Sequence, residues 1–298
     1  MGLDLTRRKA LRAGRQRRTV LGSAGLFLLL ALTGCSSSDQ DQIKRWALPP
    51  AASDTAPHMA DLWRGAWIAA LITGVLVWGL ILWSVVRYRR RTDDDVPAQT
   101  RYNMPIEVLY TIVPLIVVSV LFYFTVVVQN KVLQTSAEDV AGADHTVLVL
   151  GQKWSWNFTY VKDPALDGRT SVFDTGTPAR LPELWLPVNE SADFELRSAD
   201  VIHSFFIPSF YFKMDDIPGR HNHFVMTPTK IGTFMGRCAE LCGTYHSRML
   251  FTVRIVTAEQ YAAHLQALRM QGQVGVQRPG SATTQIAGLQ AAEEGGNP

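Results

Sequence analysis

Cysteine and charged residues are both scarce in this chain of 298 residues. Three cysteines cannot staple a disulfide scaffold together. Charged residues make up 18% of the chain, against roughly 25% in an average soluble domain. Seven of the 29 Lys and Arg lie before residue 35, after which 25 acidic residues face 22 basic ones. We therefore expect no nucleic-acid partner, and a membrane-attached protein with one modest globular domain.

Residues 1–34 are typical of a secretory signal. Basic residues precede an apolar run that is too short to cross a bilayer and that ends in Leu-Thr-Gly before Cys35. This ending resembles the bacterial lipobox, in which the cysteine is lipidated and becomes the mature N-terminus. An ordinary signal peptide with a chance cysteine is the alternative. We predict a lipid anchor on Cys35 and an outer N-terminal segment over residues 35–60.

Two longer apolar runs, residues 65–86 and 108–128, contain no charged side chain. Each reaches the roughly 20 residues that cross about 30 Å of hydrocarbon. We predict a transmembrane hairpin over residues 61–130, with helices near 63–88 and 106–130. Arginines between the runs place their connection in the cytoplasm: Arg87, Arg89, Arg90, Arg91 and Arg101. The C-terminal domain and Cys35 then both lie on the outer face of a bacterial plasma membrane.

Several hairpin residues admit a structural interpretation. Trp63, Trp67 and Trp83 are typical of an interfacial aromatic belt, and Pro114 is expected only to kink its helix. Glu107 has two interpretations. An acid at the cytoplasmic mouth of a membrane helix can belong to a proton path, or it can be a solvated acid favoured by the helix dipole.

The pattern changes after residue 144. Over residues 145–257, short segments rich in Val, Ile, Phe, Thr and Trp alternate partly with polar residues and are separated by Pro, Gly and Asp. They predict an antiparallel sandwich or barrel. Residues 258–270 predict a short C-terminal helix, opened by a capping box at Thr257. The Gly-, Ala- and Gln-rich residues 271–298 predict a disordered tail.

A group of metal-binding side chains follows one predicted strand. Cys238, Cys242, His246 and Met249 offer two thiols, an imidazole and a thioether within twelve residues. Soft donors of this kind favour copper, and Met beside Cys and His is typical of copper electron-transfer sites rather than structural zinc. A disulfide between the two cysteines is the alternative, but it leaves His246 and Met249 unexplained.

The site needs one more strong ligand. In cupredoxin-like sandwiches that ligand is a histidine from an earlier strand, and the candidates are His203, His221 and His223. His203 ends an apolar strand and is the first choice. His221 and His223 point to one face of a strand, where they form either a metal pair or a solvated surface.

These motifs resemble subunit II of the haem-copper cytochrome c oxidases, over nearly the whole mature chain. The family pattern C-x-E-x-C-x-x-x-H-x-x-M matches residues 238–249 at every position. An acidic-V-x-H-S-aromatic pattern followed by P-S matches residues 200–209, and D-x-I-P-G-R matches residues 215–220. The resemblance implies a two-helix transmembrane hairpin followed by an all-β cupredoxin-like domain that holds the dinuclear copper A centre.

The resemblance also implies residue roles around that centre. Cys238 and Cys242 bridge two coppers, which His203 and His246 cap. Met249 is the weak ligand of one copper and the backbone carbonyl of Glu240 that of the other. The Glu240 carboxylate reaches a magnesium ion shared with subunit I.

Further roles concern electron and proton transfer. Gln152-Lys153-Trp154-Ser155-Trp156 resembles the family's Q-W-x-W segment with one extra residue. It makes Trp154 the exposed aromatic that accepts the electron and Trp156 a core residue; both tryptophans in the core is the alternative. Glu107 stands seven residues before Pro114, like the glutamate at the mouth of the K proton pathway. Asp200 is expected to help dock the donor.

The resemblance implies a subunit that takes electrons from cytochrome c and passes them to the haems of subunit I, where oxygen reduction to water is coupled to proton translocation. Neither apolar run contains a histidine, so the haems lie only in subunit I. Subunits I and III are the expected partners. Residues 145–298 hold 13 basic and 14 acidic side chains, so steering of a basic donor is weak, which favours a donor tethered in the membrane or in a neighbouring complex.

Three other functions share some of these features. A quinol oxidase subunit II has the hairpin and sandwich but lacks the copper ligands that this chain retains. A membrane-anchored copper carrier needs neither a two-copper ligand set nor Trp154. Copper A domains also occur in nitrous oxide reductase and in some nitric oxide reductases, but the hairpin with a lipidated N-terminus favours the oxidase.

Overall fold

The computed structural model describes residues 37–92, 96–133, 136–177 and 180–277. The predicted signal segment and Cys35 lie outside these residues. The chain divides into two units, Met1–Pro49 and Pro50–Pro298. The described part of the first unit holds helix α2 (Ser37–Lys44). All elements named below belong to the second unit.

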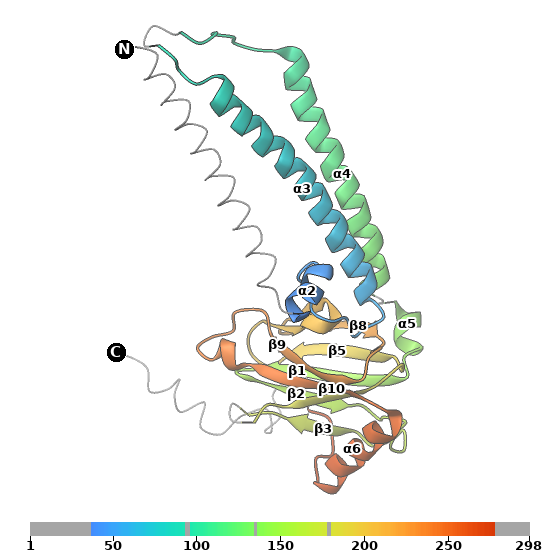
Figure 1. The fold of residues 1–298 in the computed structure, drawn as a ribbon. Helices are drawn as coiled ribbons and strands as arrows, with labels where there is room; N and C mark the ends of the chain where they lie inside the picture. The colour runs from blue at the N-terminus through green and yellow to red at the C-terminus, as the bar shows by residue number, and fades with distance from the viewer. Residues whose placement is uncertain (1–36, 93–95, 134–135, 178–179, 278–298) are drawn as a thin grey trace, which may run out of the picture. The chain divides into compact units, whose positions relative to one another are not determined.

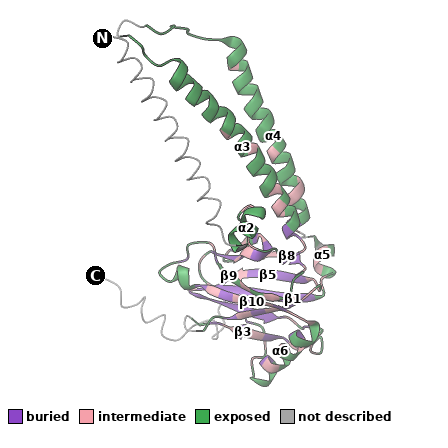
Figure 2. Ribbon diagram, viewed as in Figure 1, coloured by how far each residue is buried: buried purple, intermediate pink, exposed green. Residues whose placement is uncertain are grey.

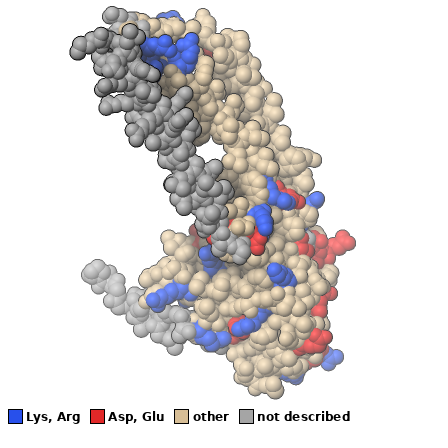
Figure 3. Space-filling view, viewed as in Figure 1, with Lys and Arg blue, Asp and Glu red and all other residues tan. Residues whose placement is uncertain are grey.

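Two long apolar helices open the second unit: α3 (Ala56–Arg87) and α4 (Met104–Leu133). Both are long and apolar enough to cross a membrane, and their side chains are exposed along nearly their whole length (Figure 2). Charged atoms are rare on their visible faces, whereas both signs are mixed over the strands (Figure 3). Helix α3 begins earlier than predicted because Pro57 can occupy its first turn, where no backbone N–H is needed.

Within the described residues, ten strands form a sandwich of two five-stranded sheets (Figure 1). One sheet has the order β3-β2-β1-β5-β8, and the other β4-β10-β9-β6-β7. The strands are β1 (His145–Gln152), β2 (Ser155–Tyr160), β3 (Val172–Thr175), β4 (Glu183–Pro187), β5 (Ala192–Ser198), β6 (His203–Ile207), β7 (Phe212–Asp216), β8 (Asn222–Met226), β9 (Gly232–Cys238) and β10 (Leu250–Val256). The expected sandwich is therefore present, but not wholly antiparallel, because β1 pairs with β5 and β10 with β4 in parallel.

The core between the sheets is rich in aromatic rings. Phe205 of β6 stacks on Phe251 of β10, with ring centroids 5.1 Å apart, and both contact Trp156 of β2 edge-on. Phe194 and Phe224 stack at 4.9 Å on the other side of Phe205. All five rings are at most 1% exposed. Because β2 and β6 carry residues of this core, the ends of these strands are held firmly in place.

The segment just before α3, within the predicted outer N-terminal segment, packs on this domain. Ala52 N–H donates to the carbonyl of Ser209, and the Ala52 carbonyl accepts from Thr229 N–H. Ser53 forms a bridge with Pro228, and its hydroxyl donates to the carbonyl of Phe210. Ala52 and Ser53 are at most 2% exposed. A fragment that contains only the β-sandwich would therefore lack the residues that cover part of its surface.

Helix α6 (Ala258–Met270) packs beside β3 and β4 and ends at the predicted residue. The Thr257 hydroxyl accepts from Gln260 N–H, while the Gln260 side chain accepts from Thr257 N–H, which is the expected capping box. The chain beyond α6 differs from the expectation of a disordered tail. The Gln273 carbonyl accepts from Phe173 N–H, and Val274 forms a bridge with Val172, so residues 273–275 lie along β3. Residues 278–298 lie outside the described part.

A buried polar network ties α6 to the start of β1. The Tyr261 hydroxyl donates to Asp163 at 2.6 Å, and His145 bridges Asp163 at 2.9 Å and Glu190 at 2.7 Å. Tyr261, Asp163 and His145 are at most 4% exposed. Burial disfavours a charged His145, but its hydrogen bonds to Asp163 and Glu190 outweigh burial and raise its pKa.

Tyr261→Phe should destabilise the fold by about 1–3 kcal/mol, because the buried Asp163 carboxylate loses a donor.

The stabilisation that His145 contributes to the fold should depend on pH. A group whose pKa is raised by folding stabilises the fold fully below its ordinary pKa of about 6.5, and that stability is lost as the pH rises through the folded value. Denaturant titration of the full chain in detergent at several pH values measures both effects. Tyr245→Phe, at a 37% exposed side chain, is the control; equal costs for the two variants would contradict the prediction.

Candidate metal centre

The two strands that meet at the edge of the core bring the predicted ligands together. His203 begins β6 and Cys238 ends β9, and these strands are paired at Phe205 and Cys238. The chain then loops through Cys242 and a short 3-10 helix, His246–Arg248, to Met249 before β10. His203, Cys238, Cys242 and Met249 are at most 5% exposed, whereas His246 is half-buried.

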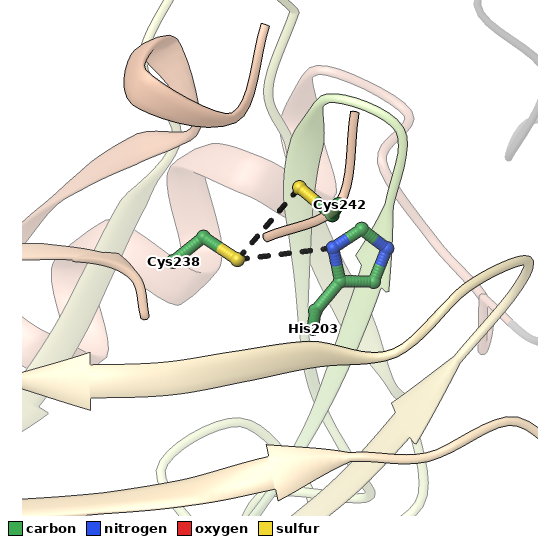
Figure 4. A group of neighbouring side chains, drawn as sticks. All are labelled: His203, Cys238 and Cys242. Carbon is green, nitrogen blue, oxygen red and sulfur yellow. Dashed lines mark hydrogen bonds between the residues drawn. The ribbon is translucent and has the colours of Figure 1, made fainter. Parts of the chain in front are cut away.

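The side chains converge on the two cysteine sulfurs. Cys238 Sγ lies 3.9 Å from both Cys242 Sγ and His203 Nδ1, and these three side chains point toward one another (Figure 4). On the other side, Cys242 Sγ lies 3.5 Å from His246 Nδ1 and 3.7 Å from Met249 Sδ. The carbonyl oxygen of Glu240 is 3.2 Å from Cys238 Sγ. Both cysteines are free thiols.

These separations fit a shared metal. Two donors that each bind one metal at about 2.0–2.3 Å lie roughly 3.3–3.8 Å apart at a tetrahedral angle. The neighbouring donor pairs above are separated by 3.2–3.9 Å. Thiolate, thioether and imidazole donors around a central sulfur pair suit copper. The residues present therefore fit a copper site.

The charge of the site favours binding a cation. The hydrogen bond between the two sulfurs lowers the pKa of Cys238, with His203 adding to the effect against the cost of burial. The same hydrogen bond, together with burial, raises the pKa of Cys242. Thiolates, not thiols, bind metals, so a bound metal would displace the thiol protons that remain.

Asp200 holds His203 in the orientation that a metal ligand needs. Its Oδ1 lies 2.8 Å from His203 Nε2, and its Oδ2 accepts from Lys153 N–H at 2.7 Å. Burial works against a charged His203, but Asp200 and Cys238 raise its pKa to about 9. With Nε2 donating to the carboxylate, Nδ1 faces Cys238 Sγ and could bind a metal that displaces its proton. Asp200, which is expected to dock a donor, thus also contacts His203, and it remains exposed.

Asp200→Ala should lower copper affinity about 10- to 100-fold, the usual cost of removing the carboxylate partner of a ligating histidine. Competitive titration of copper against a chelator checks this. The exposed Asp167→Asn is the control. An unchanged copper affinity in Asp200→Ala would mean that the carboxylate does not support His203 as a ligand.

Trp154 is buried, whereas it was predicted to be exposed. It is only 7% exposed, because the ligand loop lies across it: its Nε1 donates to the Cys242 carbonyl at 3.3 Å, and Tyr245 packs edge-on with ring centroids 4.9 Å apart. Gly243 makes this approach possible, since its φ is +123° and an added Cβ would lie 3.1 Å from the indole. Trp156 is fully buried as expected, and its Nε1 donates to the Met249 carbonyl at 3.3 Å.

Two residues near the site were not foreseen. A Cβ on Gly151 would lie 3.0–3.2 Å from the His203 ring, so glycine lets that ring approach β1. Asp216 pairs with His203 across β6 and β7, is fully buried, and burial raises its pKa well above the ordinary value. Neither carboxylate oxygen of Asp216 has a hydrogen-bond partner in the described part of the chain. Nothing in the local sequence distinguishes Asp216 from the exposed acids.

The remaining candidate residues lie apart from the cluster. His221 and His223 face Glu195 and Asp193 at 3.6 and 3.5 Å, as surface residues at β8. The Glu240 side chain is exposed. Glu107 lies in the first turn of α4, where its carboxylate accepts from Asn103 N–H at 2.7 Å. This contact is the kind that the helix-start interpretation of Glu107 predicts.

Comparison with known proteins gives consistent matches. Residues 145–256 match the family "Cytochrome C oxidase subunit II, periplasmic domain", and residues 41–127 match "Cytochrome C oxidase subunit II, transmembrane domain". A "Probable cytochrome c oxidase subunit 2" of Streptomyces avermitilis is 46% identical, covering 88% of this chain and 90% of the relative. "Cytochrome c oxidase subunit 2" of Mycobacterium tuberculosis is 38% identical, over 80% and 78%. A solved structure of the periplasmic domain of subunit II of cytochrome oxidase from Bradyrhizobium japonicum is 31% identical over 44% of this chain and 98% of that domain, with a TM-score of 0.39.

Proposed function

Because this chain belongs to the cytochrome c oxidase subunit II family, we propose that its β-sandwich accepts single electrons from a reduced cytochrome c. It passes them to the haems of subunit I, where oxygen is reduced to water with proton translocation. The convergence of His203 and His246 on the Cys238–Cys242 sulfur pair carries this proposal. Two apolar helices long enough to cross a membrane support a membrane location, and the match to the family's periplasmic domain supports the outer face.

A dinuclear copper centre, when bound, would supply one-electron transfer with little change of geometry or solvent. The residues that would hold it are those of the cluster: Cys238 and Cys242 as thiolate ligands, His203 and His246 as imidazole ligands, and Met249 and the Glu240 carbonyl as weak ligands. The chain's own part is to fix these donors and exclude water. Trp156 contacts the His203 ring at 6.1 Å, and Asp200 holds its Nε2.

The burial of the cluster counts against a copper carrier. A carrier must release its ion to a partner, which requires ligands that a partner can reach. Here His203 and Met249 are fully buried and both cysteines are 5% exposed. Ligands fixed in this way suit a resident ion that passes electrons.

Electron paramagnetic resonance of the full chain, loaded with copper in detergent, tests the function. One unpaired electron shared equally by two copper nuclei gives a hyperfine pattern distinct from that of a single copper. The assembled oxidase should show the same spectrum and lose it when reduced cytochrome c is added without oxygen. A single-copper spectrum, or an oxidised signal that cytochrome c does not bleach, would refute the proposal.

We also propose that Glu107 begins a proton path into subunit I. Its place at the cytoplasmic start of α4 supports this, and its contact with Asn103 N–H also supports the simpler capping role. Glu107→Gln should lower oxygen turnover while leaving the reduction of the copper centre by cytochrome c unchanged. A thermal destabilisation with normal turnover would leave only the capping role.

Residues 1–34 are proposed as a signal that is removed when Cys35 is lipidated. The Leu-Thr-Gly-Cys ending supports this, and an anchor on the outer face agrees with the proposed location of the sandwich. The intact mass of the mature subunit should correspond to a chain that begins at a diacylglyceryl-modified Cys35. A mature chain that retains residues 1–34, or an unmodified Cys35, would refute the anchor.

Three partners complete the proposal: subunit I, subunit III and a cytochrome c. The exposed Glu240 carboxylate is free to reach a magnesium ion at subunit I, and Glu240→Gln should weaken the signal of Mn²⁺ bound in its place. Subunit III is the other expected neighbour. The balanced charge of the domain supports a membrane-tethered cytochrome c. A fast reaction with soluble cytochrome c that collapses steeply with rising salt would exclude weak steering.

A further inference from the structure

The aromatic side chain that faces solvent above the candidate copper site is Tyr245. Its side chain is 37% exposed, whereas Trp154 beneath it is 7% exposed. The two rings meet edge to face, with centroids 4.9 Å apart and planes at 89°. The Arg248 guanidinium lies 5.6 Å from the Tyr245 ring centroid and helps to hold the ring there. A partner approaching this surface therefore meets Tyr245 before Trp154.

Contacts continue from Tyr245 to the ligands without a gap. Trp154 Nε1 donates to the carbonyl of Cys242, whose sulfur is one of the two at the centre of the cluster. Tyr245 also directly precedes His246, so its backbone joins the ligand loop. The left-handed Gly243 brings the same loop to within van der Waals distance of the indole. The surface ring, the buried ring and the ligand loop thus form one packed unit.

We propose that Tyr245, rather than Trp154, is the side chain that the donor cytochrome contacts, and that electrons cross Tyr245 and Trp154 to reach the copper ligands. This inference rests on the proposed function. One electron leaves the donor haem iron, which goes from ferrous to ferric, and the copper pair gains it. Neither ring is oxidised, no bond is made or broken, and no proton moves, because the rings serve only as the packed medium between two metal centres.

Hydroxyl-radical footprinting of the assembled oxidase tests the contact without measuring activity. In the free oxidase, Tyr245 should be oxidised by the radical and Trp154 should be protected. Adding an excess of an oxidised soluble c-type cytochrome should protect Tyr245 and leave the exposed Met235 of β9 labelled, which is 51% exposed. Labelling of Trp154 in the free oxidase, or of Tyr245 to the same extent with cytochrome bound, would overturn the proposal.

Stopped-flow reduction of the copper centre by the same cytochrome tests the path. Tyr245→Ala should slow this reduction about tenfold or more, the usual effect of truncating a central aromatic contact. Tyr245→Phe keeps the ring and should stay within about twofold of the wild type. Met235→Ala removes a comparable exposed apolar side chain and should have no effect. Footprinting of Tyr245→Ala should now label Trp154, which shows that Tyr245 is its cover.

These experiments distinguish a failure of the Tyr245 proposal from a failure of the proposed function. Each variant is first checked for the two-copper resonance spectrum, since Tyr245 neighbours His246. A wild type without that spectrum refutes the function itself. With the spectrum intact, a Tyr245→Ala oxidase that is reduced as fast as the wild type, or faster, overturns only the role of Tyr245, because Trp154 would then accept electrons without it.

Discussion

Cys242→Ser should abolish the two-copper spectrum and reduce oxidation of cytochrome c by more than about 100-fold, beyond the range seen for residues that only support a ligand. Cys242 Sγ lies close to three other candidate ligand atoms: Cys238 Sγ at 3.9 Å, His246 Nδ1 at 3.5 Å and Met249 Sδ at 3.7 Å. A serine hydroxyl is a harder donor that remains protonated at neutral pH, so it cannot bridge two soft metals. His246 and Met249 would then lose their link to Cys238.

The experiment compares the purified oxidase carrying Cys242→Ser with one carrying Thr244→Ala. Thr244 is exposed and lies in the same loop between Cys242 and His246, so its variant controls for disturbance of the loop. Resonance spectra and steady-state oxidation of a reduced soluble c-type cytochrome are measured on both. Cys242→Ser should retain at most a single-copper signal, whereas Thr244→Ala should match the wild type. A two-copper spectrum in Cys242→Ser would place the metal centre elsewhere.

The convergence of the candidate ligands could be predicted because most of them are local in sequence. Cys238, Cys242, His246 and Met249 fall within one loop, and a loop of that length can aim all four donors at one point. His203 needed the further argument that it ends an apolar strand, and β6 does pair with β9 beside Cys238. The transmembrane helices were predictable for a similar reason, since length and hydropathy alone decide them.

The exposure of Trp154 could not be predicted, because it depends on where a distant loop comes to rest. Residues 154 and 242 are 88 apart in sequence, and the backbone conformation of Gly243 decides that Tyr245 lies on the indole. The role of Asp200 is similar. Its acidic side chain suggested a docking surface, but the turn before β6 directs its carboxylate to His203 Nε2.

Two parts of the fold depend on long-range pairing in the same way. Residues 52 and 53 carry no strand pattern, yet their backbone and side-chain polar groups pair with residues 209, 210, 228 and 229. The Gly- and Gln-rich residues 271–277 have the composition of a tail, but β3 is an edge strand with free backbone groups, and Gln273 and Val274 lie beside it. Composition indicates which structure a segment can form by itself, whereas here neighbouring parts of the sandwich supply the hydrogen-bond partners of its backbone.

Phe205→Ala should destabilise the sandwich by about 3–5 kcal/mol, the usual cost of emptying a buried phenylalanine site. Phe205 is 1% exposed and contacts rings from both sheets, including Phe251 at 5.1 Å and Trp156 at 5.8 Å. Two residues before it stands His203, whose ring also contacts Trp156. The cavity would therefore loosen the support of a copper ligand as well as the core.

Phe206→Ala is the matched control for this change. Phe206 is the next residue on β6 but points to the other face, where it is half-buried under the Arg237 guanidinium at 5.3 Å. Its removal should cost about 1 kcal/mol or less. Denaturant titration of the copper-free full chain in detergent gives both free energies, and a copper titration follows on each variant. Because only Phe205 lies between the sheets and beside the support of His203, only Phe205→Ala should weaken both the fold and copper binding; equal costs for the two variants would mean that the core does not hold the site.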